Sequence, residues 1–211
     1  MSQEYDYWLL DLDGTVLTVT DEYVQRTMST VADHLDTRFR PREARRIWYG
    51  RDGLRDELLA DHGIDPERFW SVFHRIESPN DRARATRLHP DAHAILGLEG
   101  PRGVVTHCQW YLTEPILDEL GIHDWFDTVV CCSDTLGWKP DPSPVHFAMD
   151  SLGVNGEQGV LVGDSLADVQ AAHNAGLDAI LVQRDGEVFP TDADLVIDSL
   201  DALTAVTSGS G

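Results

Sequence analysis

Short apolar runs alternate with stretches of helical spacing along most of the chain. The apolar runs, each a predicted strand, cover residues 7–10, 104–106, 128–132, 159–162, 179–182 and 195–197. The stretches of helical spacing between them cover residues 90–98, 114–120, 142–152 and 167–175. Because strands and helices alternate in this order, we predict an α/β fold, with a parallel sheet that carries helices on both faces.

One long segment interrupts this alternation after the first strand. It runs from Asp21 to Arg87 with helical spacing and no strong strand signal. Helix-initiating residues divide it, at Asp21, Pro41, Asp52 and Asp65. We expect an all-helical insertion over residues 18–88, a core made of residues 1–17 and 89–207, and a disordered tail at 208–211. The insertion should lie over the carboxyl ends of the strands, where open α/β sheets bind ligands.

The composition is that of a globular protein in a reducing setting. A chain of 211 residues with 42% hydrophobic residues can bury one core, with or without a smaller inserted domain. It contains no apolar run of membrane-spanning length and no signal-peptide pattern. Its three cysteines, Cys108, Cys131 and Cys132, do not make a disulfide framework, so we expect a cytoplasmic protein.

The net charge is strongly negative, and aspartate and arginine predominate among the charged residues. The formal net charge of −21 disfavours binding to nucleic acid and to anionic membranes. The sequence has 26 aspartates against 11 glutamates, and Lys139 is its single lysine beside 15 arginines. This composition is typical of halophilic proteins, such as haloarchaeal ones, whose acidic surfaces face a high-salt cytoplasm. An ordinary acidic protein is the alternative.

The arginines gather in the insertion. Residues 18–89 hold 13 arginines and 13 acidic residues, so this segment is neutral inside an acidic chain. An arginine-rich segment can face an anionic ligand. For most of these arginines, the simpler interpretation is a solvated, salt-bridged helix face.

Residues that can carry chemistry follow the predicted core strands. In chain order they are Asp11, Asp13, Thr106, Lys139 and Asp164. Because the carboxyl ends of parallel strands share one edge of the sheet, these side chains can converge. The two carboxylates that follow the first strand suit metal-assisted nucleophilic chemistry, in which one attacks an electrophile and the other transfers a proton.

Each of these residues has a simpler role when it is considered alone. Asp11 and Asp13 could cap a turn, whereas a calcium-binding loop fails because the following glycine comes too early. Asp164 could be a helix N-cap, Thr106 an ordinary strand residue and Lys139 a surface lysine. Their joint order and spacing favour a catalytic site.

Together these motifs resemble the haloacid dehalogenase-like (HAD) superfamily. The resemblance rests on Asp11-Leu12-Asp13-Gly14-Thr15, the strand-ending Thr106, Lys139-Pro140, and the Gly-Asp-x-x-x-Asp run of residues 163–168. Their order and spacing match from residue 7 to about residue 185. The resemblance implies a Rossmann-like core, and the inserted helices look like the helical cap of phosphoglycolate phosphatase-like members.

The resemblance also implies a role for each site residue. Asp11 would be the nucleophile that forms an aspartyl-phosphate, and Asp13 would protonate the leaving alkoxide and later deprotonate water. A Mg²⁺ cofactor would be held by Asp11, the backbone carbonyl of Asp13, and Asp164.

The remaining three residues would support this chemistry. Lys139 would supply a further positive charge, and Thr106 would donate its hydroxyl to a phosphoryl oxygen. Asp168 would orient metal-bound water or the shell of the metal.

The function that this resemblance implies is a Mg²⁺-dependent phosphatase for a small phosphorylated metabolite, of the phosphoglycolate or sugar phosphate type. Asp13 argues against a dehalogenase, because a halide leaving group needs no proton. The absence of lysine from residues 18–89 argues against a phosphonoacetaldehyde hydrolase, which needs a cap lysine. A phosphosugar mutase and a non-catalytic binding protein remain open. We expect a monomer or a small homo-oligomer.

Substrate-binding residues are sought in the insertion. The run Trp48-Tyr49-Gly50-Arg51-Asp52-Gly53 loosely resembles the specificity loop of helical-cap relatives. Arg51 could bind a carboxylate or a sugar hydroxyl, with Arg45, Arg46 and Arg55 as weaker candidates. Trp48 could stack on a ligand, although core packing is the simpler role.

Overall fold

A six-stranded parallel sheet forms the centre of the larger part of the molecule. The computed structural model describes residues 5–155, 158–184, 186 and 188–204. The strands lie in the order β5-β4-β1-β6-β7-β8, and every neighbouring pair is parallel. Their bounds are β1 Tyr7–Leu10, β4 Arg102–Thr106, β5 Thr128–Cys131, β6 Gly159–Gly163, β7 Asp178–Val182 and β8 Leu195–Ile197. The predicted α/β fold is therefore confirmed.

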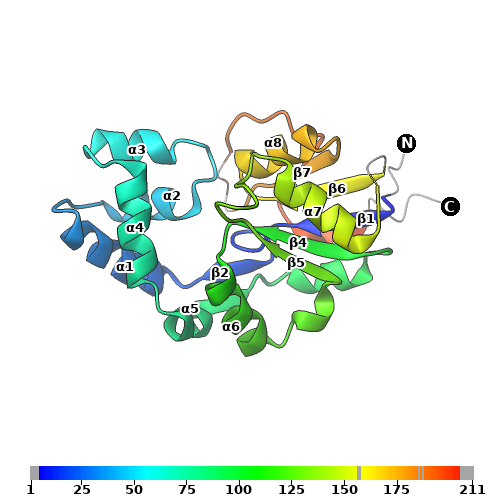
Figure 1. The fold of residues 1–211 in the computed structure, drawn as a ribbon, viewed down its shortest axis with the longest axis horizontal. Coiled ribbons are helices and arrows are strands. Elements are labelled where there is room, and N and C mark those ends of the chain that lie inside the picture. Colours follow the sequence, from blue (N-terminus) through cyan, green and yellow to red (C-terminus); the bar gives the residue numbers. More distant parts are fainter. Residues whose placement is uncertain (1–4, 156–157, 185, 187, 205–211) are drawn as a thin grey trace.

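Helices cover both faces of this sheet (Figure 1). The α-helices are α6 Trp110–Leu120, α7 Ser143–Leu152 and α8 Leu166–Asn174, and the 3-10 helices are η1 Ala92–Gly97, η2 His123–Trp125 and η3 Leu200–Ala202. On β1, Trp8 and Leu10 pack into a buried cluster with residues of α6, while Tyr7 and Leu9 pack into another with residues of α7 and α8. Because neighbouring side chains of a strand point to opposite faces, a strand covered on both faces is apolar throughout.

The insertion folds into helices at one side of the sheet (Figure 1). They are α1 Asp21–His34, α2 Pro41–Tyr49, α3 Arg55–Asp61, α4 Pro66–Ile76 and α5 Pro79–Ala85. A proline opens three of them, and the Asp65 and Ser78 side chains accept N-terminal backbone N–H groups at α4 and α5. The apolar faces of these helices enclose a buried cluster of their own around Phe69. The division into a core and a separate helical domain remains a prediction.

A short antiparallel strand pair joins the helices to the sheet. β2 Leu17–Val19 pairs with β3 Thr86–Leu88, so that Leu17 lies opposite Leu88. The prediction of no strand up to Arg87 is therefore wrong at its end. Strands of three residues are too short to show a period of two, and the partner strands are far apart in the chain.

Two predicted helices differ from the observed ones. The segment predicted as a helix over residues 90–98 is the 3-10 helix η1, and α6 begins at Trp110 rather than near Glu114. Trp110 and Tyr111 are exposed, so the first turn of α6 lacks the apolar spacing that the prediction relied on. The predicted tail at 208–211 lies outside the described residues. Among the described residues, no helix is long and apolar enough to cross a membrane.

Candidate active site

The chain leaves β1 in a tight turn that carries Asp11 and Asp13. The Asp11 N–H donates to the carbonyl of Val162 in β6 at 2.9 Å, which extends the sheet bonding one residue past β1. Gly14 has a φ of 94°, in the left-handed region. A Cβ atom there would lie 1.9 Å from Asp164 Oδ2. Glycine is therefore required for the turn and for the close approach of Asp164.

Lys139 lies among the carboxylates at the ends of the strands. Its ammonium group donates to Asp11 Oδ1 at 2.7 Å, to Asp168 Oδ1 at 2.6 Å and to the Val105 carbonyl at 2.8 Å. These bonds use all three N–H donors of the ammonium. Because the side chain is only 2% exposed, the alternative of a surface lysine is wrong. The sole lysine of the sequence is buried in the site.

Asp164 and Asp168 flank the start of α8. Ser165 is the N-cap of this helix, and Asp168 Oδ2 accepts hydrogen bonds from the Ser165 N–H at 3.0 Å and the Ser165 hydroxyl at 2.5 Å. This capping box fixes the Asp168 carboxylate, whose other oxygen faces Lys139. Asp164 is therefore not the cap. Its Oδ2 instead accepts from Arg51 Nε of the helical segment at 2.5 Å.

Thr106 ends β4 at the same edge of the sheet. Its side chain is buried, and its hydroxyl oxygen accepts from the Cys108 N–H at 3.0 Å. Because the hydroxyl is only an acceptor in this contact, its proton can be donated to another acceptor.

Burial dominates the electrostatics of the three carboxylates. Burial raises the pKa of Asp11 well above its usual range, Lys139 opposes the rise, and the charges of Asp168 and Asp164 add to it. Burial also raises the pKa of Asp164 to about 6, against the effect of Arg51. Burial acts in the same direction on Asp168, but the charge and hydrogen bond of Lys139 together with the hydrogen bond from Ser165 outweigh it and hold that pKa below its usual range. Lys139 pairs with Asp11 and Asp168, and Arg51 pairs with Asp164, so two cations face three carboxylates, and a further cation would relieve the remaining negative charge.

Asp13 contacts the helical segment instead of Lys139. Its Oδ1 accepts from Arg82 Nη2 at 2.6 Å. The Arg82 guanidinium lies over the Trp48 ring, 5.0 Å from the centroid, and its Nε is 3.8 Å from Glu77 Oε1. Sequence reasoning missed both Arg82 and Glu77. No sequence signal separates Arg82 from the other arginines of the insertion, because its burial depends on tertiary packing.

A cavity of about 640 Å³ opens between the sheet edge and the helical segment. All six predicted core residues line it, namely Asp11, Asp13, Thr106, Lys139, Asp164 and Asp168. The helical segment contributes residues that include Trp48, Tyr49, Arg55, Trp70, Phe73, His74, Glu77 and Arg82. One opening therefore gives access to the whole group of strand-end residues.

The substrate-binding candidates of the insertion occupy different places. Trp48 lines the cavity and also packs edge-on against Tyr23 and Phe73. Arg51 is held by Asp164 and does not belong to the cavity lining. Arg45 is not part of the cavity lining, and its Nη1 pairs with the exposed Asp21 at 2.5 Å.

The two weaker candidates for substrate binding, Arg55 and Arg46, differ in their position relative to the cavity. Arg55 lines the cavity and donates to the backbone carbonyls of Ile47 and Trp48. Arg46 pairs with Asp52 at 2.5 Å and is partly exposed. Together with the pair of the exposed Arg40 and the half-buried Glu43, such contacts fit the interpretation of a salt-bridged helix face.

Comparison with known proteins gives the family of this chain. A family model described as haloacid dehalogenase-like hydrolase matches residues 8–182. The chain belongs to the haloacid dehalogenase-like hydrolase family. A plasmid-encoded phosphoglycolate phosphatase of Cupriavidus necator is 31% identical to this HAD-like chain, over 94% of it and 91% of the relative.

Other relatives extend this picture of the HAD-like chain. An N-acetylmuramic acid 6-phosphate phosphatase of Pseudomonas putida is 26% identical over 90% of both chains. A solved structure from Lactobacillus plantarum, assigned as a phosphoglycolate phosphatase, superposes with a TM-score of 0.81. It is 18% identical and covers 96% of this chain and 99% of its own, which shows the shared fold. The predicted family and enzyme class, a phosphoric monoester hydrolase, are confirmed.

Three carboxylates of this HAD-like site could hold a metal ion. Asp11, Asp164 and Asp168 are buried and each places an oxygen within 4.8 Å of the others. Carboxylate oxygens are hard ligands that suit Mg²⁺. Both oxygens of Asp168 already accept hydrogen bonds from Lys139 and Ser165, which leaves Asp11 and Asp164 as the better direct ligands.

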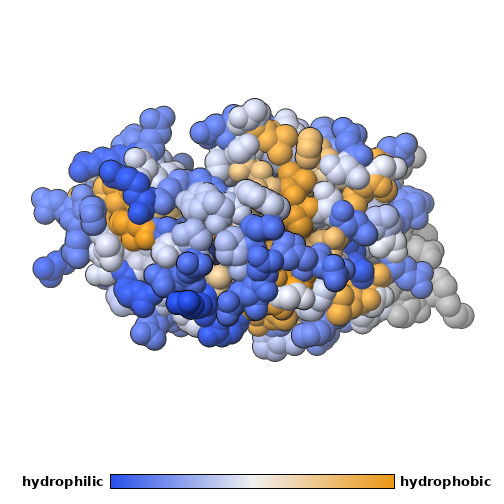
Figure 2. Space-filling view, turned by 60° about the horizontal axis from the view of Figure 1, so that its bottom comes forward, coloured by the Kyte–Doolittle hydropathy of each residue, from blue (hydrophilic) through white to orange (hydrophobic). Residues whose placement is uncertain are grey.

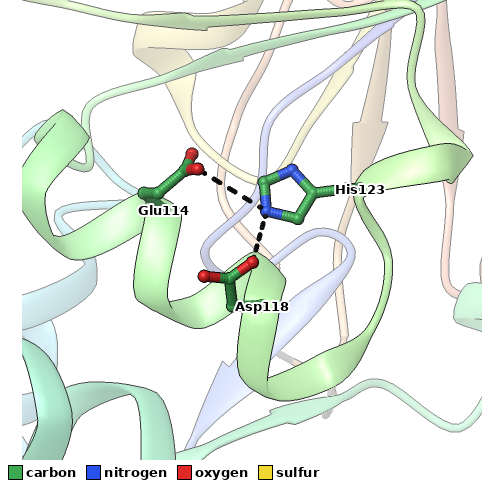
Figure 3. A group of neighbouring side chains, drawn as sticks. All are labelled: Glu114, Asp118 and His123. Carbon is green, nitrogen blue, oxygen red and sulfur yellow. Dashed lines mark hydrogen bonds and ion pairs between the residues drawn. The ribbon is translucent and has the colours of Figure 1, made fainter.

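A second group of potential ligands lies on the surface, on α6 and at the start of η2 (Figure 3). His123 Nε2 is 3.0 Å from Asp118 Oδ1 and 3.9 Å from Glu114 Oε1. The same ring nitrogen faces both carboxylates, and all three side chains are exposed to solvent. These contacts are those of a surface ion-pair cluster, and none of the three residues lines the cavity.

Proposed function

We propose that this protein is a Mg²⁺-dependent phosphatase that hydrolyses a small phosphate monoester through an aspartyl-phosphate formed on Asp11. The observation that carries this proposal is the arrangement around the cavity. Lys139 joins Asp11 to Asp168, and Asp13 lines the same opening. A nucleophile, a fixed positive charge and a proton carrier thus share one cavity.

Asp11 attacks the phosphorus atom in this proposal. Its carboxylate must approach a phosphate dianion, so positive charge has to offset their repulsion. Lys139 supplies such a charge 2.7 Å from Asp11 Oδ1, and Mg²⁺ held by Asp11 and Asp164 would supply more. Thr106 donates its hydroxyl proton to a phosphoryl oxygen.

Asp13 carries the protons of both half-reactions. It gives a proton to the leaving alkoxide, and then takes one from the water that hydrolyses the aspartyl-phosphate. Its side chain is 25% exposed and lines the cavity, so it can meet both groups. Dehalogenation needs no such group, so Asp13 favours phosphate ester hydrolysis.

The proposed substrate is a phosphorylated metabolite of the phosphoglycolate or sugar phosphate type. The relatives named for phosphoglycolate and N-acetylmuramic acid 6-phosphate support both kinds. The cavity of about 640 Å³ falls within the usual size range of small-molecule sites, and the Trp48 and Trp70 rings on its wall suit a sugar-sized leaving group. Arg51 stays a candidate for substrate binding only if it leaves Asp164.

Three further properties stay proposals from the sequence. They are a cytoplasmic location, adaptation to high salt, and a monomeric or small homo-oligomeric state. The three cysteines are free, which fits a reducing compartment. The net charge of −21 supports adaptation to salt.

A substrate screen tests the proposed function. Purified protein is incubated with Mg²⁺ in low salt and in molar KCl, with phosphoglycolate, hexose phosphates, N-acetylmuramic acid 6-phosphate and nucleoside monophosphates. We expect phosphate release from at least one of them, and loss of release in Asp11→Asn. ³¹P NMR of the products separates a hydrolase from a mutase, which would return the phosphoryl group to a sugar. No phosphate release under any of these conditions would overturn the proposal.

A further inference from the structure

Arg82 of α5 is a buried charge that reaches from the helical segment into the site. Its side chain is 3% exposed, and its closest ionic partner is Asp13, at 2.6 Å. We propose that Arg82 is a positioning residue that holds the Asp13 carboxylate at the leaving-group side of the cavity. This inference rests on the proposed function, because it assigns Arg82 a task only if Asp13 carries the leaving-group proton.

Besides Asp13, Trp48 and Glu77 lie against the Arg82 guanidinium. Trp48 lies against its face at 5.0 Å, and Glu77 Oε1 lies 3.8 Å from Nε. Glu77 is itself 5% exposed, and burial raises its pKa to about 7, while Arg82 acts in the opposite direction. A guanidinium packed against an aromatic face and a second carboxylate has few alternative positions. It can therefore act as a rigid anchor for Asp13.

The geometry also leaves Asp13 able to react. Arg82 engages Oδ1 of Asp13, so the other carboxylate oxygen can meet the leaving-group oxygen. General acid catalysis requires that oxygen to lie within hydrogen-bond reach of the atom it protonates. A carboxylate on a turn after β1 would otherwise rotate about its side-chain torsions. The contact with Arg82 selects one orientation and so reduces the entropy lost in reaching the transition state.

The contact between Arg82 and Asp13 links the orientation of the Asp13 carboxylate to the helical segment. α5 ends three residues after Arg82, where β3 carries the chain back toward the sheet. The neighbouring Arg84 is on the same helix but is exposed, so it shares the helix and the charge without the contact to Asp13. Arg84 therefore provides a matched control.

The experiment compares two classes of phosphate ester. An alkyl phosphate, such as a hexose 6-phosphate that the enzyme accepts, needs a proton on its leaving oxygen, whereas p-nitrophenyl phosphate has a leaving group that needs little protonation. kcat/KM with Mg²⁺ is measured for both esters in wild type, Arg82→Gln, Arg82→Lys, Arg84→Gln and Asp13→Asn. The ratio of kcat/KM for the two esters reports the first half-reaction, in which the leaving group departs.

We expect Arg82→Gln to lower kcat/KM for the alkyl phosphate by about 100-fold and that for p-nitrophenyl phosphate by less than about 10-fold. Arg84→Gln should change neither value. Arg82→Lys keeps the charge beside Glu77 but loses the planar guanidinium, so its ratio of kcat/KM for the two esters should lie between those of wild type and Arg82→Gln. If Arg82→Gln does not fold, as judged by circular dichroism, the same comparison is made with Arg82→Lys.

Two different failures can be told apart. In the first case, Asp13→Asn lowers kcat/KM more for the alkyl phosphate than for p-nitrophenyl phosphate, but the Arg82 variants lower kcat/KM equally for both esters or for neither. Arg82 then does not position Asp13, and this inference is overturned. If Asp13→Asn itself shows no dependence on the leaving group, the proton-carrying role of Asp13 in the proposed function is wrong, and the inference fails with it.

Discussion

Asp11 and Asp13 stand two residues apart, yet they have separate partners and so separate expected effects. Asp11 is bound by Lys139, and Asp13 by Arg82. We expect Asp11→Asn to abolish the phosphoenzyme, and Asp13→Asn to slow turnover by roughly 10²–10⁴ while metal affinity stays near that of wild type. Acid-quenched intact-protein mass spectrometry measures the phosphoenzyme, and Mn²⁺ titration measures metal affinity. Near-normal turnover in Asp11→Asn would contradict the assignment of the nucleophile.

Gly14 is a second residue whose replacement has a calculable effect. Alanine there combines a φ of 94° with a Cβ 1.9 Å from the Asp164 carboxylate, so Asp164 would have to move. Gly63→Ala is the matched control, because Gly63 has a φ of 68° and open space around its Cβ position. We expect the control to lose roughly 1–2 kcal/mol in the free energy of unfolding, and Gly14→Ala to lose at least about twice as much. Urea unfolding measures both losses, and equal values would show that the contact with Asp164 is unimportant.

The elements of the core are predictable because β1 and its neighbours are covered on both faces. Such strands read as continuous apolar runs, and the parallel order follows from the helices between them. The pair of β2 and β3 is different, since three-residue strands carry too little pattern and find each other only through the folded helical segment. η1 differs for a related reason, because the sequence signals of a helix do not distinguish a 3-10 turn from an α-helix.

The junction between α4 and α5 should give the stability a specific pH dependence. Burial raises the pKa of Glu77 from 4.5 to about 7, so its neutral form is favoured in the folded protein. Its contribution to stability is therefore complete below pH 4.5 and is lost as the pH rises toward 7. Glu77→Gln is neutral at every pH, so its free energy of unfolding should fall less than that of wild type across this window.

A control for this pH effect lies on α2. Arg40 lowers the pKa of Glu43 from 4.5 to about 2, so Glu43 is already mostly ionised above pH 5 in both the folded and the unfolded state. Glu43→Gln should leave the slope of stability against pH unchanged there. Urea unfolding at several pH values gives the slopes, and identical slopes for Glu77→Gln and wild type would argue against the raised pKa of Glu77.

At the scale of the whole molecule, charge should make stability depend on salt. Outside residues 18–89 the chain has three cations against 24 acidic residues. The space-filling view shows mostly hydrophilic residues over the helical end and a more mixed surface over the other half (Figure 2). The Debye length falls from about 10 Å at 0.1 M salt to about 3 Å at 1 M, so salt screens the repulsion among the acidic residues.

We therefore expect the melting temperature to rise between low salt and molar KCl. The same osmotic strength of a neutral osmolyte serves as the control, because it does not screen charge. Differential scanning calorimetry in both series measures the effect. An equal rise in both series would contradict a charge-based adaptation to salt.

The candidate site divides into a part that sequence predicts and a part that it does not. The strand-end residues converge because parallel topology brings the carboxyl ends of β1, β4 and β6 to one edge. Arg82, the partner of Asp13, comes from the insertion. No periodic pattern in the sequence shows how the insertion packs against the core. The sequence therefore does not distinguish Arg82 from the other arginines, and it offers Arg51 as a candidate for ligand binding, whereas in the structure Arg51 pairs with Asp164.

The single buried lysine gives this protein an unusual chemical reporter. An amine-reactive reagent can modify side chains only at Lys139, whose ammonium is shielded and bonded to Asp11 and Asp168. Acylation of this position, followed by peptide mapping, would therefore measure how often the site opens to solvent under native conditions. The acylation rate at Lys139 would follow local or global unfolding without any engineered label.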